Sequence, residues 1–200
     1  MQTIEVATSS RTYNVHIASG LLPRVGEIAR STAGGSRSMV VSNTDVAPLY
    51  SAAVLESLSA AGYKTDIHVV ESNETVKNMS ELALLLEHCA EAELTRDDLV
   101  VALGGGVVGD LAGFAAATYM RGCKLVQVPT SLLAMVDSSV GGKTAVDLAH
   151  GKNLAGAFFQ PRAVVASVEA LDTIAPDLFA DSCGEVIKYG VMSDPGLFVS

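Results

Sequence analysis

Hydrophobic and polar residues alternate with two different periods along this chain, and the two periods separate predicted strands from predicted helices. Apolar side chains at every second position predict an opening hairpin across a Ser-Ser-Arg turn, with Ile4 and Val6 on one strand and Val15 and Ile17 on the other. Short runs rich in apolar and β-branched residues predict further strands over 38–42, 64–70, 99–103, 124–128 and 163–168.

Apolar residues spaced three and four apart predict the helices. They favour helices over 46–61, 78–94 and 107–118, a short helix from Ser131, and one from Pro176 through Lys188. In the second of these, Met79, Leu82, Leu86 and Cys89 or Ala90 are expected on the buried face. Strands that alternate with helices of about a dozen residues predict an α/β fold, a parallel sheet with helices on both faces.

After Thr173 the alternation of predicted strands and helices gives way to a helical stretch, which predicts a domain boundary near Ile174. Residues 1–174 would form the α/β domain and 175–200 the beginning of a helical domain. A further helix begins as the chain stops at Ser200, so we expect a truncated piece of a longer protein.

Composition narrows the class of protein. Of 200 residues, 49% are apolar, which is enough for a packed core. The net charge of −9 argues against nucleic acid as a general partner. Three widely spaced cysteines and an N-terminus without a signal peptide predict reduced thiols in a cytoplasmic protein. The apolar run 99–120 contains three consecutive glycines and Asp110, so it is not expected to span a membrane.

A glycine-rich turn follows the predicted strand 99–103 and opens a helix. Gly104, Gly106 and Gly109 have the GxGxxG spacing, which lets a diphosphate approach backbone N–H groups at the positive end of a helix. Such turns are also common where nothing binds. The next strand, LVQVP, lacks the usual acidic residue for the ribose hydroxyls, and Asp110 stands at the helix start instead.

Several other loops carry polar groups that allow either a ligand contact or a structural role. The segment ESNETVK follows a predicted strand and is either a surface loop or a ligand contact. Thr130 or Ser131, after a later strand, can serve as a helix N-cap. GGKT lacks the full P-loop spacing, so Lys143 lies in either an anion site or a turn. Lys152 and Asn153 repeat that chemistry in GKN.

Glu185 and Lys188 are three residues apart on a predicted helix and share a face, as a solvated pair would. The four histidines, His16, His68, His88 and His150, are scattered, and each is expected at the surface or in a loop.

Together, LGGGVVGDLAGF, VDSSVGGKTA, GKNLAGAF and GEVIKYG resemble 3-dehydroquinate synthases, in the same order along essentially the whole chain. The resemblance implies a Rossmann-like NAD-binding domain followed by a helical metal and substrate domain. It implies a homodimer that converts the seven-carbon sugar acid phosphate DAHP to 3-dehydroquinate, with NAD and zinc or cobalt, in the shikimate pathway of aromatic amino acid biosynthesis.

The resemblance also implies roles for residues of this chain. Substrate binding falls to Asp137, Lys143, Asn153 and Lys188, with Arg121 reaching the substrate phosphate across a dimer interface. Glu185 is the implied zinc ligand, and the two histidine ligands are expected beyond Ser200. The implied NAD contacts are Asn43, Ser72, Asn73, Glu74, Lys77, Gly105, Gly106, Val107, Gly109, Asp110, Thr130, Ser131, Leu133, Lys143, Lys152 and Thr173.

The sequence departs from the family pattern in a few places. Ser72 and Asn73 stand where Asp-Gly is common, Met135 where Gln is frequent, and Asp147 where Asn is frequent. None of these changes removes a charge that the chemistry needs. Three other hypotheses stay open: a related cyclase such as 2-deoxy-scyllo-inosose synthase, a non-catalytic NAD-binding module, and a dehydrogenase of the same superfamily.

Overall fold

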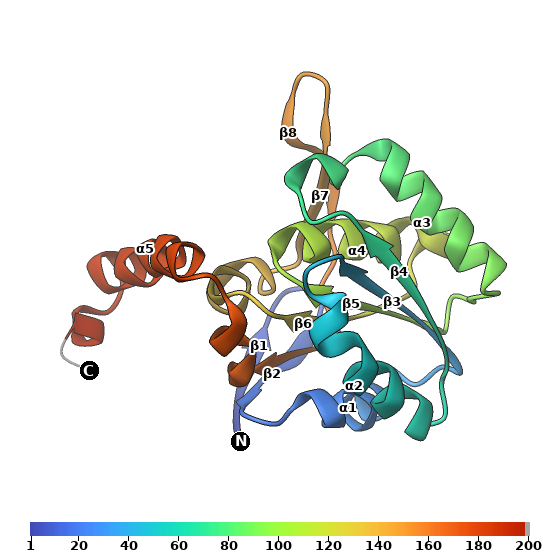
Figure 1. The fold of residues 1–200 in the computed structure, drawn as a ribbon, viewed down its shortest axis with the longest axis horizontal. Helices are drawn as coiled ribbons and strands as arrows, with labels where there is room; N and C mark the ends of the chain where they lie inside the picture. The colour runs from blue at the N-terminus through green and yellow to red at the C-terminus, as the bar shows by residue number, and fades with distance from the viewer. Residues whose placement is uncertain (199–200) are drawn as a thin grey trace.

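A seven-stranded sheet forms the centre of the protein in the computed structural model, which describes residues 1–198 (Figure 1). The strands lie in the order β1-β2-β9-β6-β5-β3-β4, with β1 antiparallel to β2 and all other neighbours parallel. This arrangement confirms the predicted α/β class. The strands are β1 (Gln2–Ala7), β2 (Thr12–Ala18), β3 (Arg37–Asn43), β4 (Lys64–Val70), β5 (Leu99–Gly104), β6 (Lys124–Pro129) and β9 (Ala163–Ser167).

Helices cover both faces of this sheet, as predicted (Figure 1). Successive side chains of a strand point to opposite faces. In β3, Val40 therefore packs with the helices of one face, while Met39 and Val41 pack with those of the other. The helices are α1 (Val25–Thr32) and α2 (Ala47–Ala60) on one face, and α3 (Met79–Glu91) and α4 (Gly106–Thr118) on the other.

Apart from short helical turns, two parts of the fold were not predicted from the sequence. One is α1, and the other is an antiparallel hairpin of β7 (Lys143–Leu148) and β8 (Gly151–Phe158) that projects from the α4 side (Figure 1). The predicted buried face of α3 was also partly wrong. Met79 is 49% exposed, and Leu85 is fully buried in the core beside Leu82 and Cys89.

A long helix, α5 (Pro176–Met192), follows the sheet domain and extends away from it (Figure 1). Its start agrees with the helix expected from Pro176, and the division into two domains stays a prediction. Short helical turns complete the fold: η1 (Leu22–Arg24), η2 (Glu74–Val76), η3 (Tyr119–Arg121), the π-helix η4 (Ala134–Ser138), η5 (Val168–Thr173) and η6 (Pro195–Phe198).

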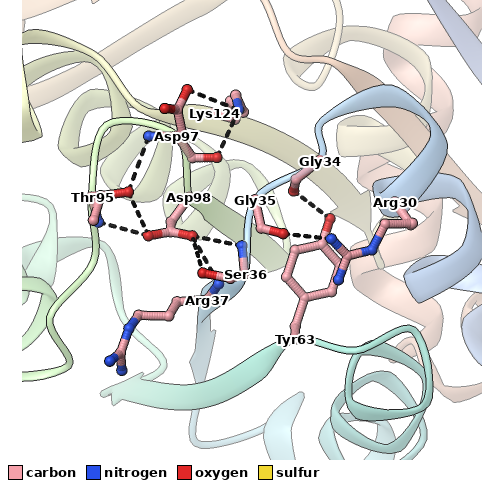
Figure 2. A network of polar contacts seen from close by, with 10 residues as sticks. All are labelled: Arg30, Gly34, Gly35, Ser36, Arg37, Tyr63, Thr95, Asp97, Asp98 and Lys124. Atoms are coloured by element: carbon pink, nitrogen blue, oxygen red, sulfur yellow. Dashed lines mark hydrogen bonds and ion pairs between the residues drawn. The ribbon is translucent and has the colours of Figure 1, made fainter.

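A buried carboxylate fastens the amino ends of β3 and β5 (Figure 2). Asp98 accepts hydrogen bonds of 2.8 Å from the backbone N–H groups of Ser36, Arg37 and Thr95, and one of 2.7 Å from the Thr95 hydroxyl. Burial alone would raise the pKa of Asp98, but these hydrogen bonds outweigh it and hold the pKa below its usual value. The network is structural, because ligands of open α/β sheets bind at the opposite, carboxyl ends.

The cysteines are free, as expected for reduced thiols. Burial raises the pKa of both Cys89 and Cys123 to about 12, so these thiols stay protonated and unreactive near neutral pH. Among the described residues, no helix combines the length and the apolar character needed to cross a membrane.

Candidate functional site: two adjoining cavities

The order of strands reverses between β3 and β5, and a cavity of about 620 Å³ lies at this point. From β3 the chain continues outward to β4, whereas β5 lies on the other side of β3 and leads to β6. Such a reversal leaves a crevice at the carboxyl ends of the strands, where ligands bind. Many of the predicted NAD contacts line this cavity: Asn43, Ser72, Asn73, Glu74, Gly105, Gly106, Val107, Thr130, Ser131, Leu133 and Thr173.

The N-terminus of α4 opens into this cavity. Gly105 is its N-cap and provides no side-chain cap, so the first backbone N–H groups of the helix are left for a ligand. Gly105 has an extended backbone with φ of −78°, so any residue could adopt its conformation. A β-carbon there would lie 3.4 Å from Ser131 Oγ, at the cavity wall. The glycine therefore keeps the helix end accessible, which fits the diphosphate of a dinucleotide.

Two of the predicted NAD contacts have structural roles. One of them also lines the cavity, and the other does not. Ser131 lines the cavity and also accepts a hydrogen bond of 3.3 Å from Ala134 N–H, as the N-cap interpretation predicts. Gly109 faces the sheet, because a β-carbon there would lie 3.0 Å from Gln127 Oε1. It lets α4 pack closely on β6 and does not line the cavity.

A second cavity, of about 440 Å³, adjoins the first at the start of α4. A β-carbon on Gly106, in the first cavity, would lie 3.1 Å from Oγ of Ser138, which lines the second. Predicted substrate and cofactor residues gather in this second cavity: Asp110, Asp137, Lys143 and Asn153. It combines carboxylates with a cation and an amide, a set suited to a ligand that bears hydroxyl groups and an anion.

Lys77 connects the loop after β4 to α4 and to the β7–β8 hairpin. Its side chain is only 6% exposed, and Nζ donates to Asp110 Oδ2 at 2.8 Å and to Asn153 Oδ1 at 2.6 Å. Asp147 Oδ1 lies 4.0 Å from the same nitrogen and accepts a 2.7 Å hydrogen bond from Asn153 N–H. A lysine so deeply buried needs this compensation, so the four side chains form one structural and electrostatic unit.

Burial raises the pKa of Asp110 above its usual value, although the hydrogen bond from Lys77 acts in the opposite direction. Asn153 has a left-handed backbone, with φ of 58°, which asparagine tolerates better than most residues. Asp147 stands where the family often has asparagine. Its carboxylate lies beside Lys77 and accepts the hydrogen bond from the Asn153 N–H, which orients Asn153.

An exposed ion pair joins the same loop and hairpin. Lys152 Nζ donates to Glu74 Oε1 at 2.7 Å, with side-chain exposures of 67% and 50%. Glu74 lines the first cavity, whereas Lys152 lines neither. The pair lies where the predicted coenzyme and substrate regions meet.

Lys143 follows a turn rather than a P-loop. Gly141 and Gly142 have left-handed φ values of 90° and 71°, and a strand follows them where a P-loop requires a helix. GGKT is therefore not a P-loop, and the turn places Lys143 at the wall of the second cavity, so the anion-site hypothesis stays open.

Other predicted site residues lie outside both cavities. Arg121 is in η3, about 20 Å along α4 from its N-terminus, with a left-handed φ of 63°. Glu185 and Lys188 on α5 contact each other, as the ion-pair interpretation predicts. Within residues 1–198, no three histidine, cysteine or acidic side chains converge as metal ligands. Glu185 thus belongs to no such group in the described part of the chain, and the side chains around it do not by themselves make up a zinc site.

Sequence reasoning missed some residues at these cavities. Tyr189 donates from its hydroxyl to Asp137 Oδ1 at 3.2 Å and so connects α5 to the wall of the second cavity. Tyr50 lines the first cavity, and its hydroxyl lies 2.5 Å from Thr173 Oγ1. Tyr189 stands in the GEVIKYG motif, which was the available signal, whereas no motif surrounds Tyr50.

Of the four histidines, only His150 is both exposed and outside the strands and helices, whereas His16 is half-buried in β2 and the other two are half-buried as well. His68 lies in β4 and His88 in α3, and their Nδ1 atoms are 3.1 Å apart. Neither residue lines either of the two cavities described above.

Comparison with protein families gives a match to the model described as 3-dehydroquinate synthase N-terminal, over residues 67–181. A 3-dehydroquinate synthase of Geobacter metallireducens is 48% identical over 198 residues, which cover 99% of this chain and 55% of the relative. A 3-dehydroquinate synthase of Paracoccus denitrificans is 45% identical, covering 99% and 54%. The chain thus spans about half the length of these curated relatives.

Solved structures of sugar-phosphate cyclases have the same fold. A 2-deoxy-scyllo-inosose synthase complexed with carbaglucose-6-phosphate, NAD+ and Co2+ matches with a TM-score of 0.87 and 28% identity, covering 94% of this chain and 50% of that one. The 2-epi-5-epi-valiolone synthase of Streptomyces hygroscopicus subsp. jinggangensis, with NAD+ and Zn2+ bound, matches with a TM-score of 0.85 and 25% identity, covering 96% and 53%.

Proposed function

Because the chain belongs to the 3-dehydroquinate synthase family, we propose that it forms the NAD-binding half of an enzyme that converts DAHP to 3-dehydroquinate with elimination of phosphate. The observation that carries this proposal is the pair of adjoining cavities. One is an anion-accepting crevice at a helix N-terminus, and the other holds carboxylates, a lysine and an asparagine. A coenzyme in the first cavity would border a phosphorylated substrate in the second.

The residues of the chain have separate tasks in this proposal. The N-terminal amides of α4 hold the coenzyme diphosphate, while Leu133 and Val107 offer it apolar surface. The bound NAD would supply reversible acceptance of a hydride from the carbon that bears a substrate hydroxyl, and the ketone formed would make the neighbouring C–H acidic. Lys143 and Asn153 hold the substrate phosphate, and Asp137, oriented by Tyr189, accepts a hydrogen bond from a substrate hydroxyl.

Further parts of the proposal lie outside the two cavities. Arg121 would bind the substrate phosphate of a partner copy in a homodimer, which suits its place far from the cavities of its own chain. Glu185 would become a zinc ligand together with residues beyond Ser200, and its pairing with Lys188 would then be exchanged for the metal. The free cysteines support a reducing compartment such as the cytoplasm.

A related cyclase is the second candidate, since the fold matches 2-deoxy-scyllo-inosose synthase with a TM-score of 0.87. Product identification with the complete enzyme separates the two. We expect DAHP to give 3-dehydroquinate, a carbocycle that retains the carboxylate. Turnover of glucose-6-phosphate without turnover of DAHP would establish the alternative.

The 200-residue chain should bind NAD, and Gly105→Val should weaken that binding at least tenfold. The valine side chain fits the extended backbone at this position but projects toward Ser131, where it narrows the approach to the α4 amides. Isothermal titration calorimetry with NAD measures the effect. The control is Gly184→Ala, at a position on α5 where a β-carbon meets nothing within 4 Å. Equal affinity for Gly105→Val and the wild type, with both chains folded, would place the coenzyme elsewhere.

A further inference from the structure

Lys77 directs its ammonium group at protein side chains. Of its three N–H donors, one goes to Asp110 Oδ2 at 2.8 Å and one to Asn153 Oδ1 at 2.6 Å, while Asp147 Oδ1 lies 4.0 Å from the nitrogen. The side chain is only 6% exposed, and Lys77 lines neither of the two cavities. The family resemblance implies Lys77 as an NAD contact, but a residue with these contacts acts on a ligand through its neighbours.

The contact with Lys77 determines which way the Asn153 amide faces. A lysine ammonium only donates hydrogen bonds, so the amide atom beside it must be the oxygen, Oδ1. The amide nitrogen, Nδ2, then lies on the side of the amide away from Lys77. Among residues 1–198, no oxygen accepts a hydrogen bond from Nδ2, so its two N–H donors are available to a ligand.

Asn153 is fixed at the wall of the second cavity by its backbone as well. Its N–H donates to Asp147 Oδ1 at 2.7 Å, and its backbone is left-handed, with φ of 58°. The residue is exposed and lines the second cavity together with Lys143. With the backbone held by Asp147, the main freedom left to Asn153 is rotation of its side chain, and Lys77 restrains that rotation.

We propose that Lys77 is a positioning residue for the substrate phosphate. By holding Oδ1 of Asn153, it presents Nδ2 to the second cavity, where Nδ2 donates to a phosphate oxygen beside Lys143. The oxygens of a phosphate dianion are acceptors, so an amide turned the other way would place Oδ1 against them and repel the ligand. This role rests on the proposed function, in which Lys143 and Asn153 hold the substrate phosphate.

Steady-state kinetics of the complete enzyme with DAHP test this role. Lys77→Met should raise KM by about fivefold or more and change kcat less, because the lost phosphate contact is made in the ground state as well as in the transition state. Partial unfolding lowers the apparent kcat and leaves KM unchanged, so a loss of stability cannot imitate this result. The control Lys64→Met removes an exposed ammonium at the amino end of β4 and should leave both constants unchanged.

A double-mutant cycle separates positioning from charge. Loss of Lys77 also leaves Asp110, which lines the second cavity, without its cation, and that carboxylate could repel a phosphate by itself. In an Asn153→Ala background, Lys77→Met should change KM for DAHP by less than about twofold, since no amide remains to be oriented. An equal increase in KM in both backgrounds would show that Lys77 acts through charge alone, and would overturn the proposal.

A measurement on the unsubstituted 200-residue chain guards against variants that fail to fold or to turn over substrate. Titration with inorganic phosphate should shift the ¹⁵N and ¹H resonances of Asn153 Nδ2, which are assigned by their absence in Asn153→Ala. The matched control is Asn78, whose Nδ2 already donates to the backbone oxygen of Thr75 at 2.6 Å and should not respond. Unchanged Asn153 resonances would overturn the proposal. A shift of these resonances, combined with a complete enzyme that does not convert DAHP, would refute the proposed function and leave phosphate binding by Asn153 established.

Discussion

Lys77→Met should destabilise the folded chain by about 2–3 kcal/mol at pH 7, because it leaves Asp110 in a largely buried site without its cation. Methionine preserves the length of the side chain, so the cavity contribution is small. Asn153 loses its 2.6 Å hydrogen bond at the same time, and with it the contact that fastens the hairpin to the loop after β4. Urea unfolding of the coenzyme-free chain measures the change in the free energy of unfolding.

The pH dependence of the free energy of unfolding should identify Asp110 as the cause of the stability loss in Lys77→Met. The pKa of Asp110 in the folded chain is already raised, and removing Lys77 raises it further. A raised pKa favours the folded state at low pH, and that advantage is lost as pH rises through the unfolded value of about 3.9 toward the folded value. The penalty of Lys77→Met should therefore shrink as pH falls from 7 through the raised pKa of Asp110 toward the unfolded value of about 3.9, since protonated Asp110 needs no cation.

Lys152→Met is the matched control for this experiment. It removes an ammonium group from the same loop and hairpin, but from an exposed pair with Glu74. Solvent screens that pair, so we expect no measurable change in the unfolding midpoint. Equal behaviour of the two variants across this pH range would mean that Lys77 and Asp110 do not form the buried pair seen in the structure.

The parts of the fold that the sequence predicts well are those in which a single segment determines its own burial. The strands β3, β5 and β6 are almost entirely buried, so their apolar runs mark them whatever their neighbours are. The hairpin β7–β8 could not be predicted in this way. Its polar residues Lys143, Lys152 and Asn153 interrupt the alternation of side chains, because they serve the cavity and the loop after β4 rather than a core.

The candidate site likewise has parts that the sequence predicts and parts that it does not. The turn at Gly105 and Gly106 has a recognisable spacing because a helix N-terminus and its glycines are adjacent in sequence. Contacts between distant segments leave no such pattern. Lys77 and Asn153 are 76 residues apart, and His68 and His88 meet only because β4 lies beside α3. Asp98 looks like an ordinary loop residue in the sequence, although its exposed fraction is 1%.

Asp98→Asn should destabilise the chain by about 2–4 kcal/mol at pH 7, although the substitution changes the shape of the side chain very little. Both carboxylate oxygens accept from donors, with Oδ1 facing the N–H groups of Ser36 and Arg37 and Oδ2 facing Thr95 (Figure 2). An asparagine amide places an N–H group against one of these sets of donors. The structure has no acceptor to replace the one that is lost, so buried N–H groups stay unsatisfied.

The sign of the pH dependence follows from the lowered pKa of Asp98. Its contribution is fully present above the unfolded value of about 3.9 and is lost as pH falls through the folded value. The difference in the free energy of unfolding between wild type and Asp98→Asn should therefore be constant from pH 7 to 5 and narrow below about pH 4. The neighbouring Asp97→Asn alters a residue whose side chain is 89% exposed, so it should change stability by less than about 0.5 kcal/mol. If Asp98→Asn were as mild as Asp97→Asn, the carboxylate at the amino ends of β3 and β5 would be a solvated surface group, and the joint between these two strands would have to depend on apolar packing alone.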